Sequence, residues 1–420
     1  MFALVDVNAF YCSAEQVFKP EWRGKPLIVL SNNDGCIVAA NKQAIALGIQ
    51  KFQPYFKARQ LCEKAGIIVC SSNYELYADL SHKMMQIIGR FAPEQHIYSI
   101  DETFLSFNAC EKLIPDLSLY AQKIRRAVWK ETRLPVCVGI GSTLTLAKVA
   151  NHIAKKWPGY NGVCVLHDKQ LKKQVFEQLV PSDVWGIGRK THEKLKQHNI
   201  KSVLQLSEVN PNRLPVKFNV ELQRTIRELN GEICKLWDGV RADKCQIFST
   251  RSTGQRITDV ESLKQALAKH ITIACHKARL QGSLCGTLMA FVANSPFDET
   301  PCNHKLLIHF YPATNDTSLL LNALNKNIKQ LYKPGIAYYK IGIGLLNLSS
   351  EKHQQYDLFN PSNNNSSLMK VLDDVNQRYG SDSMYFAAQG TNVTWSMRRE
   401  LLTPQYTTKW LQIPNINCKS

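Results

Sequence analysis

Tyr98-Ser99-Ile100-Asp101-Glu102-Thr103-Phe104 places two adjacent carboxylates at the centre of a β-rich stretch. The apolar residues on either side predict two short strands, which puts Asp101 and Glu102 at or near the tip of a hairpin. Successive residues of a flat strand point to opposite faces, so both acids can serve one site only where a turn or bulge breaks the alternation. Taken alone, the pair is as compatible with an idle, solvated hairpin as with a metal site.

A third carboxylate comes from the beginning of the chain. Met1-Phe2-Ala3-Leu4-Val5-Asp6-Val7-Asn8 is an apolar run with one acid near its carboxyl end, and this pattern predicts a strand with Asp6 at a sheet edge. Two divalent ions roughly 3.5–4 Å apart, held by about three carboxylates, can activate an attacking oxygen and stabilise a leaving phosphate. Asp6, Asp101 and Glu102 are therefore candidates for a two-metal site.

Composition limits the class of protein. The chain has 420 residues, of which 44% are hydrophobic, and a net charge of +18, which together predict about three or four domains and an extended polyanionic partner. The 13 cysteines form no CxxC pair, so neither a zinc module nor a disulfide framework is expected. The start lacks the basic segment of a signal peptide, and no uncharged run is long enough for a membrane span. We expect a cytoplasmic protein with no membrane partner.

The segment after Asp6 has helical spacing and carries two aromatic residues, Phe10 and Tyr11, one turn from that acid. An aromatic ring beside a nucleotide sugar could exclude a 2′-hydroxyl. Aromatic residues at a strand-to-helix junction are more often part of a core, and the residues alone leave both roles open.

Three lysines are candidates for phosphate contacts. A buried strand predicted at 136–140 leads into a helix at 144–156, whose Lys148 and Lys155 are seven residues apart and share a face. That face can meet triphosphate oxygens. Lys42, on a shorter helix, could also meet a phosphate, although an isolated surface lysine usually meets only water.

Trp185-Gly186-Ile187-Gly188-Arg189-Lys190 is a glycine turn that opens a basic helix. Backbone N–H groups in such a turn are free to bind a phosphate. The surrounding apolar residues match those on which a helix-hairpin-helix packs, so phosphate binding is favoured over a plain turn. The candidate DNA-binding residues here are Gly186, Gly188, Arg189 and Lys190.

A second βαββαβ order follows a polar tether at 236–245. Its strands are expected near 246–258, 284–293, 304–311 and 338–348, and its helices near 259–280 and 317–332. The first of these strands contains Arg251 and Arg256 in a polar alternation that leaves one face open to a nucleic-acid backbone. Such a surface offers positive, sequence-neutral contact.

The last segment changes character and has no catalytic pattern of its own. Gln355-Tyr356-Asp357-Leu358-Phe359 lies between polar linkers, so its Leu-Phe pair either anchors in a partner's pocket or folds back onto the protein. Further on, 368–378 predicts a helix and 384–388 a strand.

Taken together, Asp6-Val7-Asn8-Ala9-Phe10-Tyr11, Tyr98-Ser99-Ile100-Asp101-Glu102 and Trp185-Gly186-Ile187-Gly188 resemble the Y-family of DNA polymerases. The resemblance covers nearly the whole chain, and it implies an α+β multidomain fold. The implied parts are a ferredoxin-like palm at 1–20 and 76–168, a fingers insertion at 21–75, a helical helix-hairpin-helix thumb at 169–235, a βαββαβ little finger at 246–350, and a small tail at 351–420 with a clamp-binding peptide and an interaction region.

Carried over by position, the resemblance makes Asp6, Asp101 and Glu102 the ligands of two Mg²⁺ ions, with the Val7 carbonyl assisting. These three acids are then the catalytic residues of a DNA-directed DNA polymerase, a nucleotidyltransferase.

The resemblance also implies the nucleotide contacts. Tyr11 becomes the steric gate against ribonucleotides, Phe10 and Ser99 line the incoming nucleotide, and Lys155 matches the triphosphate lysine. Many family members carry Tyr and Arg in the helix that here contains Lys42, so this residue is a candidate to replace part of that grip.

The implied function is error-prone translesion synthesis during SOS repair and mutagenesis, from dNTPs on primer-template DNA. The implied partners are a sliding clamp, bound through Gln355, Leu358 and Phe359, and a processed UmuD dimer and a RecA filament, both contacted by the tail. Two other classes stay open: a non-catalytic DNA-binding accessory subunit, and a metal-dependent nuclease or nucleotide cyclase on a similar palm.

Overall fold

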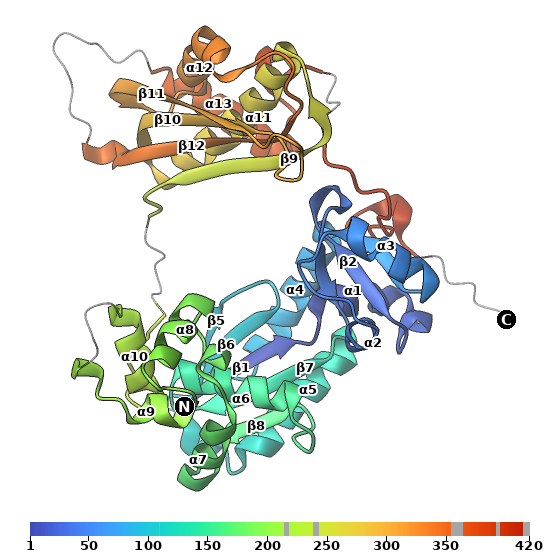
Figure 1. Cartoon of the computed structure of the whole chain (residues 1–420), viewed down its shortest axis with the longest axis vertical. Coiled ribbons are helices and arrows are strands. Elements are labelled where there is room, and N and C mark those ends of the chain that lie inside the picture. Colours follow the sequence, from blue (N-terminus) through green and yellow to red (C-terminus); the bar gives the residue numbers. More distant parts are fainter. Residues whose placement is uncertain (109, 214–217, 238–242, 354–363, 392–394, 415–420) are drawn as a thin grey trace. The chain divides into compact units, whose positions relative to one another are not determined.

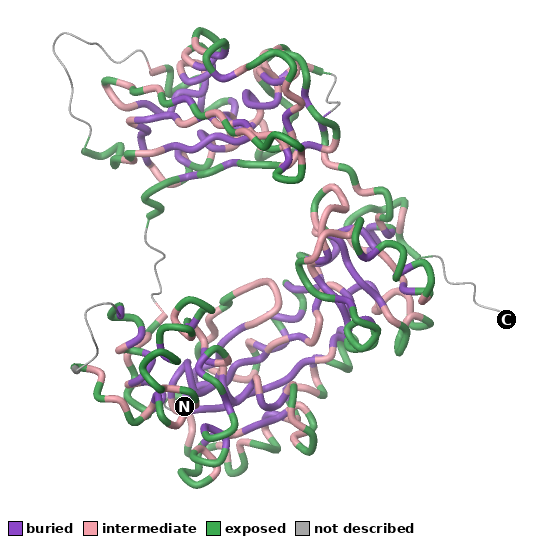
Figure 2. The backbone as a smooth tube through the Cα atoms, in the orientation of Figure 1, coloured by how far each residue is buried: buried purple, intermediate pink, exposed green. Residues whose placement is uncertain are grey.

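The computed structural model describes residues 1–108, 110–213, 218–237, 243–353, 364–391 and 395–414 (Figure 1). The chain divides into two compact units, Met1–Gly239 with Glu400–Ser420, and Val240–Arg399. Buried residues form separate cores in the two units (Figure 2). The limits of the palm, fingers, thumb, little finger and tail stay predictions.

A five-stranded sheet is the centre of the first unit, in the order β5-β6-β1-β7-β8. Strand β1 lies between β6 and β7 and is antiparallel to both, while β7 and β8 are parallel. Apolar residues at nearly every position of β1 explain its central place, because a strand covered on both faces needs no polar alternation. The strands are β1 (Phe2–Val7), β5 (Glu94–Ile97), β6 (Glu102–Ser106), β7 (Val136–Gly141) and β8 (Val163–Leu166).

Helix α6 packs unusually close to this sheet. At Gly139 of β7 an added Cβ would lie 2.0 Å from the backbone nitrogen of Asn151 on α6. The Asn151 amide in turn donates to the carbonyl oxygens of Leu4 and Cys137 at 3.2 and 2.9 Å. The helices of this part are α1 (Phe10–Phe18), α4 (Tyr74–Gly89), α5 (Leu117–Thr132) and α6 (Leu144–Lys156).

The insertion between α1 and α4 is a small α/β body with a core of its own. Its sheet has the order β3-β2-β4, in which β2 and β3 are antiparallel and β2 and β4 parallel. The elements are β2 (Leu27–Leu30), β3 (Ile37–Ala40), α2 (Lys42–Ala46), α3 (Tyr55–Lys64) and β4 (Ile68–Ser71).

Four helices follow β8, and the apolar residues expected to frame a helix-hairpin-helix share one core there. A buried carboxylate ties them to α6: Glu228 accepts hydrogen bonds from the backbone nitrogens of Thr145 and Lys235 at 3.0 and 2.9 Å. The four are α7 (Lys169–Gln178), α8 (Arg189–Gln197), α9 (Val203–Glu208) and α10 (Val220–Leu229).

The second unit is a four-stranded antiparallel sheet in the order β11-β10-β12-β9, packed against helices. The strands and helices expected of the second βαββαβ order are confirmed, with limits that differ from the expected ones by a few residues. They are β9 (Ile247–Ile257), α11 (Val260–Gln281), β10 (Ser283–Ala293), β11 (Asn303–Thr314), α12 (Thr317–Leu331) and β12 (Tyr338–Ser350), and α13 (Ser366–Tyr379) follows.

The expectation of a strand at 384–388 was wrong. The chain there has no strand partner in the described structure and instead forms the 3-10 helix η7 (Ala387–Gln389). Phe386 packs on the core of the second unit, and the Gln389 amide donates to the Thr272 hydroxyl at 3.0 Å. These bulky residues therefore anchor a loop to α11 rather than extend a sheet.

The remaining short elements are 3-10 helices. Among the helices that the structure describes, none combines the length and apolar character needed to cross a bilayer. The 3-10 helices other than η7 are η1 (Pro20–Trp22), η2 (Asn32–Asp34), η3 (Glu111–Leu113), η4 (Pro181–Asp183), η5 (Pro211–Arg213), η6 (Glu351–His353) and η8 (Trp410–Gln412).

The close approach of α6 to β7 gives a stability prediction. Gly139→Ala should lower the free energy of unfolding of the first unit by about 3 kcal/mol, because the added methyl group must push α6 away from the sheet. Thermal unfolding of the purified chain would measure the change. Gly188→Ala is the control: an added Cβ there meets nothing within 4 Å and φ is −78°. Equal melting temperatures for the two variants would contradict this packing.

Candidate active site

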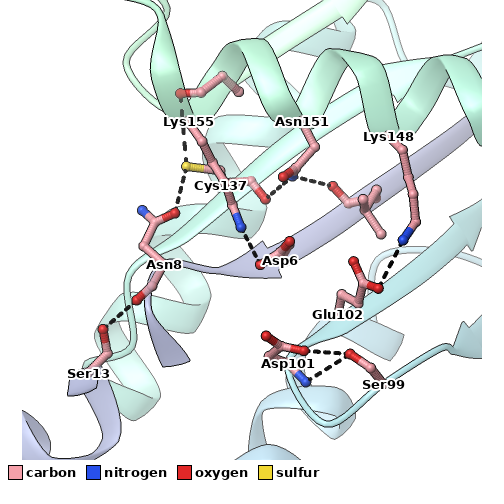
Figure 3. Close-up of polar contacts among 12 residues, drawn as sticks. Asp6, Asn8, Ser13, Ser99, Asp101, Glu102, Cys137, Lys148, Asn151 and Lys155 are labelled. Atoms are coloured by element: carbon pink, nitrogen blue, oxygen red, sulfur yellow. Dashed lines mark hydrogen bonds and ion pairs between the residues drawn. The ribbon is translucent and has the colours of Figure 1, made fainter. Parts of the chain in front are cut away.

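Three carboxylates meet where β1 ends beside the β5–β6 hairpin (Figure 3). In the antiparallel register Asp6 lies opposite Glu102, and the backbone nitrogen of Val7 donates to the carbonyl of Asp101 at 3.0 Å. The residues between Ile97 and Glu102 belong to neither strand, which provides the break in alternation that two neighbouring acids require. The backbone of the fold therefore brings Asp6, Asp101 and Glu102 to the same end of β1.

The hairpin tip is held by its own hydrogen bonds. The backbone nitrogens of Tyr98 and Ser99 donate to the carbonyl of Glu102 at 3.2 and 3.1 Å. The Ser99 hydroxyl donates to the Asp101 carboxylate and accepts from the Asp101 backbone nitrogen. Ser99 therefore orients Asp101 in this structure.

Two lysines of α6 neutralise two of the acids. Lys155 forms an ion pair with Asp6, and the Nζ of Lys148 lies 3.0 Å from Oε1 of Glu102. The face shared by the two lysines is thus turned toward the carboxylates (Figure 3). Each lysine reaches a different strand, so α6 supplies positive charge across the whole width of the site.

Lys148 also lies among aromatic rings. Its Nζ is 4.2 Å from the ring centre of Tyr98, 4.8 Å from that of Trp185 and 5.8 Å from that of Phe104. The Nζ of Lys235 lies 4.6 Å from the Trp185 ring as well. Cation–π contacts of this kind join the hairpin, α6 and the turn before α8. No role was predicted for Trp185, since no local pattern in the sequence shows which cation its ring contacts.

Burial changes the acidity of Asp6. The pKa of its carboxyl is raised from 3.8 to about 6, first by removal from water and further by the charges of Asp101 and Glu102, while Lys155 acts in the opposite direction. An ionised Asp6 is therefore costly unless a cation accompanies it.

A cavity of about 310 Å³ opens in front of these residues. It brings together the predicted Phe10, Tyr11 and Lys155 with two of the acids, while Lys42 and Ser99 do not line it. Lys51 of the insertion lines the cavity too. This residue was not predicted, because its neighbours in the sequence do not distinguish it from other surface lysines. The lining residues are Asp6, Val7, Ala9, Phe10, Tyr11, Val38, Ala39, Lys51, Ile100, Asp101 and Lys155.

Tyr11 is fixed in this wall by other rings. It stacks on Tyr77 with ring centres 4.5 Å apart and planes at 17°, and it meets Tyr74 edge-on at 6.0 Å. Burial, Tyr74 and Asp101 raise the pKa of Tyr11, so its hydroxyl stays protonated at neutral pH. Phe10 is buried in the core of the unit and also lines the cavity, so its place in the core is confirmed and its contact with a nucleotide stays a prediction.

The residues proposed to contact DNA are exposed. Gly186 has φ +87° and Gly188 caps the N-terminus of α8, which begins with Arg189 and Lys190. The glycine at 186 is needed because L side chains rarely adopt this φ.

The two arginines of β9 differ in their partners. Arg256 forms a bidentate pair with Asp298, with both N–O distances at 2.7 Å, and this contact lowers the pKa of Asp298. Arg251 lies 3.9 Å from the Met397 sulfur. A phosphate contact by Arg256 therefore has to compete with Asp298. The predicted clamp-binding residues Gln355, Leu358 and Phe359 lie outside the described residues.

The donor set suits a hard divalent ion, because Mg²⁺ prefers carboxylate and carbonyl oxygens. With the side chains as placed, no three Asp, Glu, His or Cys residues in the described chain are gathered closely enough to hold one. Asp6 and Glu102 pair instead with Lys155 and Lys148. The residue types and the raised pKa of Asp6 fit a metal site, and the assignment of individual ligands stays a prediction.

The fold is that of the Y-family DNA polymerases. A Y-family DNA polymerase chimera of Dbh and Dpo4 matches with a TM-score of 0.64 and 19% sequence identity, over 83% of this chain and 100% of that one. In sequence, residues 5–152 match the impB/mucB/samB family, residues 244–358 match the C-terminal domain of that family, and residues 366–416 match a domain of unknown function.

Two relatives narrow the identification. Protein UmuC of Salmonella typhimurium is 39% identical over 416 residues, and protein ImpB of the same species is 38% identical over 422 residues. The matches cover 98% of both chains for UmuC and 99% of both for ImpB. The chain therefore belongs to the impB/mucB/samB family. The expected Y-family membership and the α+β multidomain fold are confirmed, and membership implies a divalent metal cofactor in general terms.

The raised pKa of Asp6 predicts how stability depends on pH in the absence of metal. Between pH 3.8 and about 6 the folded state binds more protons at Asp6 than the unfolded state, so its stability falls as pH rises, by up to about 3 kcal/mol from this group. Asp6→Asn should remove this loss. In EDTA at pH 7.5 we expect it to raise the urea midpoint of the first unit.

Glu177→Gln is the control for that measurement, because it neutralises an exposed carboxylate of the same unit and should leave the midpoint within error. If Asp6→Asn were less stable than wild type at pH 7.5 and equally stable at pH 4, Asp6 would be a stabilising ion-pair partner and not a strained one.

Proposed function

We infer that this chain is an error-prone translesion DNA polymerase, a DNA-directed nucleotidyltransferase that acts in SOS repair and mutagenesis. The observation that carries this inference is that Asp6, Asp101 and Tyr11 line one cavity in a chain of this family. We propose that the chain adds dNTPs to a primer opposite a damaged template, in the cytoplasm.

In this proposal Asp6, Asp101 and Glu102, with the carbonyl of Val7, hold two Mg²⁺ ions. When bound, these ions make the primer 3′-hydroxyl a better nucleophile and offset the charge that develops as it displaces pyrophosphate from the α-phosphate. Asp6 and Glu102 lie on paired strands, and Asp101 lies in the turn before β6, where the Val7 nitrogen bonds to its carbonyl. The fold therefore sets the positions of the carboxylates before the substrate arrives.

The other cavity residues bind and orient the nucleotide. Lys155 on α6 and Lys51 in the insertion both line the cavity, and both can pair with triphosphate oxygens. Tyr11 is proposed to exclude a 2′-hydroxyl. Phe10, in the cavity lining, and Ser99, outside it, are proposed to line the incoming nucleotide. Lys42 is proposed to take part in the phosphate grip from its exposed place at the start of α2.

We propose that Gly186, Gly188, Arg189 and Lys190 contact the DNA backbone, and that Arg251 and Arg256 do so from the second unit. Contacts to phosphate are independent of sequence, which suits an enzyme that must follow any template. We further propose a sliding clamp bound at Gln355, Leu358 and Phe359, and a processed UmuD dimer and a RecA filament as partners of the tail.

Loss of one acid tests the chemistry. Asp101→Asn should lower primer extension by at least about a thousandfold while DNA affinity changes less than twofold, because the amide can neither hold the metal charge nor alter the distant DNA contacts. Extension on an abasic template with Mg²⁺ and dNTPs measures the first quantity and fluorescence anisotropy the second. Each protein is assayed with and without the UmuD dimer and a RecA filament.

Glu177→Gln is the control, since it makes the equivalent change at an exposed residue of α7, outside both the site and the tail, and it should leave extension intact. Retained synthesis by Asp101→Asn would overturn the site assignment. Intact DNA binding without extension in any combination would favour the non-catalytic accessory subunit.

The clamp proposal predicts a conditional defect. Replacing Leu358 and Phe359 together by alanine should reduce extension severalfold only when the clamp is loaded, because two apolar side chains no longer fill its pocket. Extension of long primers with and without clamp measures this difference. An equal loss in both conditions would point to damage of the polymerase itself.

A further inference from the structure

The C-terminal residues 400–406, which we call the strap, lie on the insertion and on the helices beside the cavity. In Figure 1 this red segment runs beside the blue insertion that carries β2 and α3. The backbone nitrogen of Leu401 donates to the Ser71 hydroxyl at 2.9 Å, and the Ser71 backbone nitrogen donates to the carbonyl of Leu401 at 2.9 Å. The strap therefore covers the outer edge of β4, which would otherwise be an open sheet edge.

A second anchor lies two residues beyond the end of β4. The amide of Asn73, which is fully buried, donates to the carbonyl and the hydroxyl of Thr403 at 3.1 and 3.0 Å, and to the carbonyl of Pro404 at 3.3 Å. Asn73 also caps the N-terminus of α4. The strap is thus joined to the start of the helix that carries Tyr77.

Glu15 extends the contact toward the active site. This carboxylate is fully buried, and burial raises its pKa, while the hydroxyl groups of Tyr77 and Thr403 act in the opposite direction. The Tyr77 hydroxyl donates to Oε1 of Glu15 at 2.6 Å. The other carboxylate oxygen of Glu15 has no hydrogen-bond partner in the described structure, so Tyr77 is what holds this buried group. Thr403 reaches Tyr77 through the amide of Asn73, which caps the helix that carries Tyr77.

The last link is the ring stack. Tyr77 is held by Glu15 at its hydroxyl, and its face lies against Tyr11 with ring centres 4.5 Å apart. Glu15 and Tyr11 are one turn apart on α1, so Tyr77 contacts the same face of α1 twice. Further along, Tyr406 stacks on Phe18 of the same helix at 4.6 Å, and the strap therefore also contacts the C-terminal end of α1.

We propose that the strap is a specificity-determining element for the sugar of the incoming nucleotide, with Thr403 and Glu15 as positioning residues for Tyr11. This inference rests on the proposed polymerase function. Because Tyr11 lines the cavity in front of Asp101, a small displacement of its ring changes the space left for a 2′-hydroxyl. The C-terminal segment thereby acts on substrate choice without touching the substrate.

The test is single-nucleotide insertion by the full chain on undamaged primer-template, with dNTP and with the rNTP of the same base. Thr403→Val removes the hydroxyl at constant shape and should lower the ratio of kcat/KM for dNTP over rNTP by roughly tenfold, because sub-ångström misplacement is enough for such an effect. Thr403→Ser keeps the hydroxyl and should keep the ratio. Thr408→Val makes the same change at an exposed residue two positions after the strap, and it should leave the ratio unchanged.

Glu15 provides an independent pair of variants. Glu15→Ala removes the acceptor for Tyr77 and should lower the ratio, whereas Glu15→Gln keeps an acceptor oxygen and should largely restore it. In a Tyr11→Ala background, Thr403→Val should cause no further loss, because residues that act through one another are not additive. A general loss of folding would lower dNTP insertion and melting temperature instead, and it would not be rescued by serine at 403.

The outcomes separate the two proposals. If wild type inserts dNTPs and Tyr11→Ala loses sugar selection, but Thr403→Val and Glu15→Ala keep it, the role of the strap is overturned and the polymerase function stands. If wild type extends no primer under any condition, the proposed function fails and the inference fails with it. Equal loss of selection in Thr403→Val and Thr408→Val would also overturn it, since the effect would not depend on the contact of the Thr403 hydroxyl with Asn73.

Discussion

The antiparallel register between β1 and β6 is the constraint on which the site depends. It places Asp6 opposite Glu102, and it lets the Val7 nitrogen close the hairpin tip onto Asp101. A slip of one residue would exchange the faces of β1 and turn Asp6 away from the hairpin. The apolar side chains on both faces of β1 oppose such a slip, because every one of them would have to move into a different core.

The negative charge of the three acids is the second constraint, and helix α6 compensates part of it with two lysines. Burial raises the pKa of Asp6, and the charges of Asp101 and Glu102 raise it further, so negative charge is costly at this place. Lys155 and Lys148 reach over from α6 to two of these acids. The close packing of α6 on Gly139 and the buried Glu228 at its first turn fix the helix that carries these lysines, so the packing of the unit also sets the electrostatics of the site.

Local patterns predicted the acids, the two lysines on one face, and the strands of the second unit, because alternation and helical spacing are properties of neighbouring residues. Contacts between residues that are far apart in the sequence produce no such local pattern. Lys51 of the insertion lines the cavity, and the ring of Trp185 contacts Lys148 of α6. Thr403 forms a hydrogen bond with Asn73, which is 330 positions away in the sequence. The prediction of a strand at 384–388 was wrong for the same reason. A β-rich composition does not show whether another strand is available for pairing, and in the described structure none pairs with this stretch.

Two carboxylates on neighbouring elements, the partly buried Asp6 and the fully buried Glu15, have different kinds of partner, and the difference bears on function. Asp6 is paired with a flexible ammonium group at the cavity, a partner that can move when another cation arrives. Glu15 is bonded to the neutral hydroxyl of Tyr77 inside the core, where an exchange of partner would leave a buried group unsatisfied. The first arrangement suits a ligand that must change its contacts during a reaction cycle. The Glu15–Tyr77 contact suits a rigid support for the Tyr11 ring. The strap lies on this rigid part of the site.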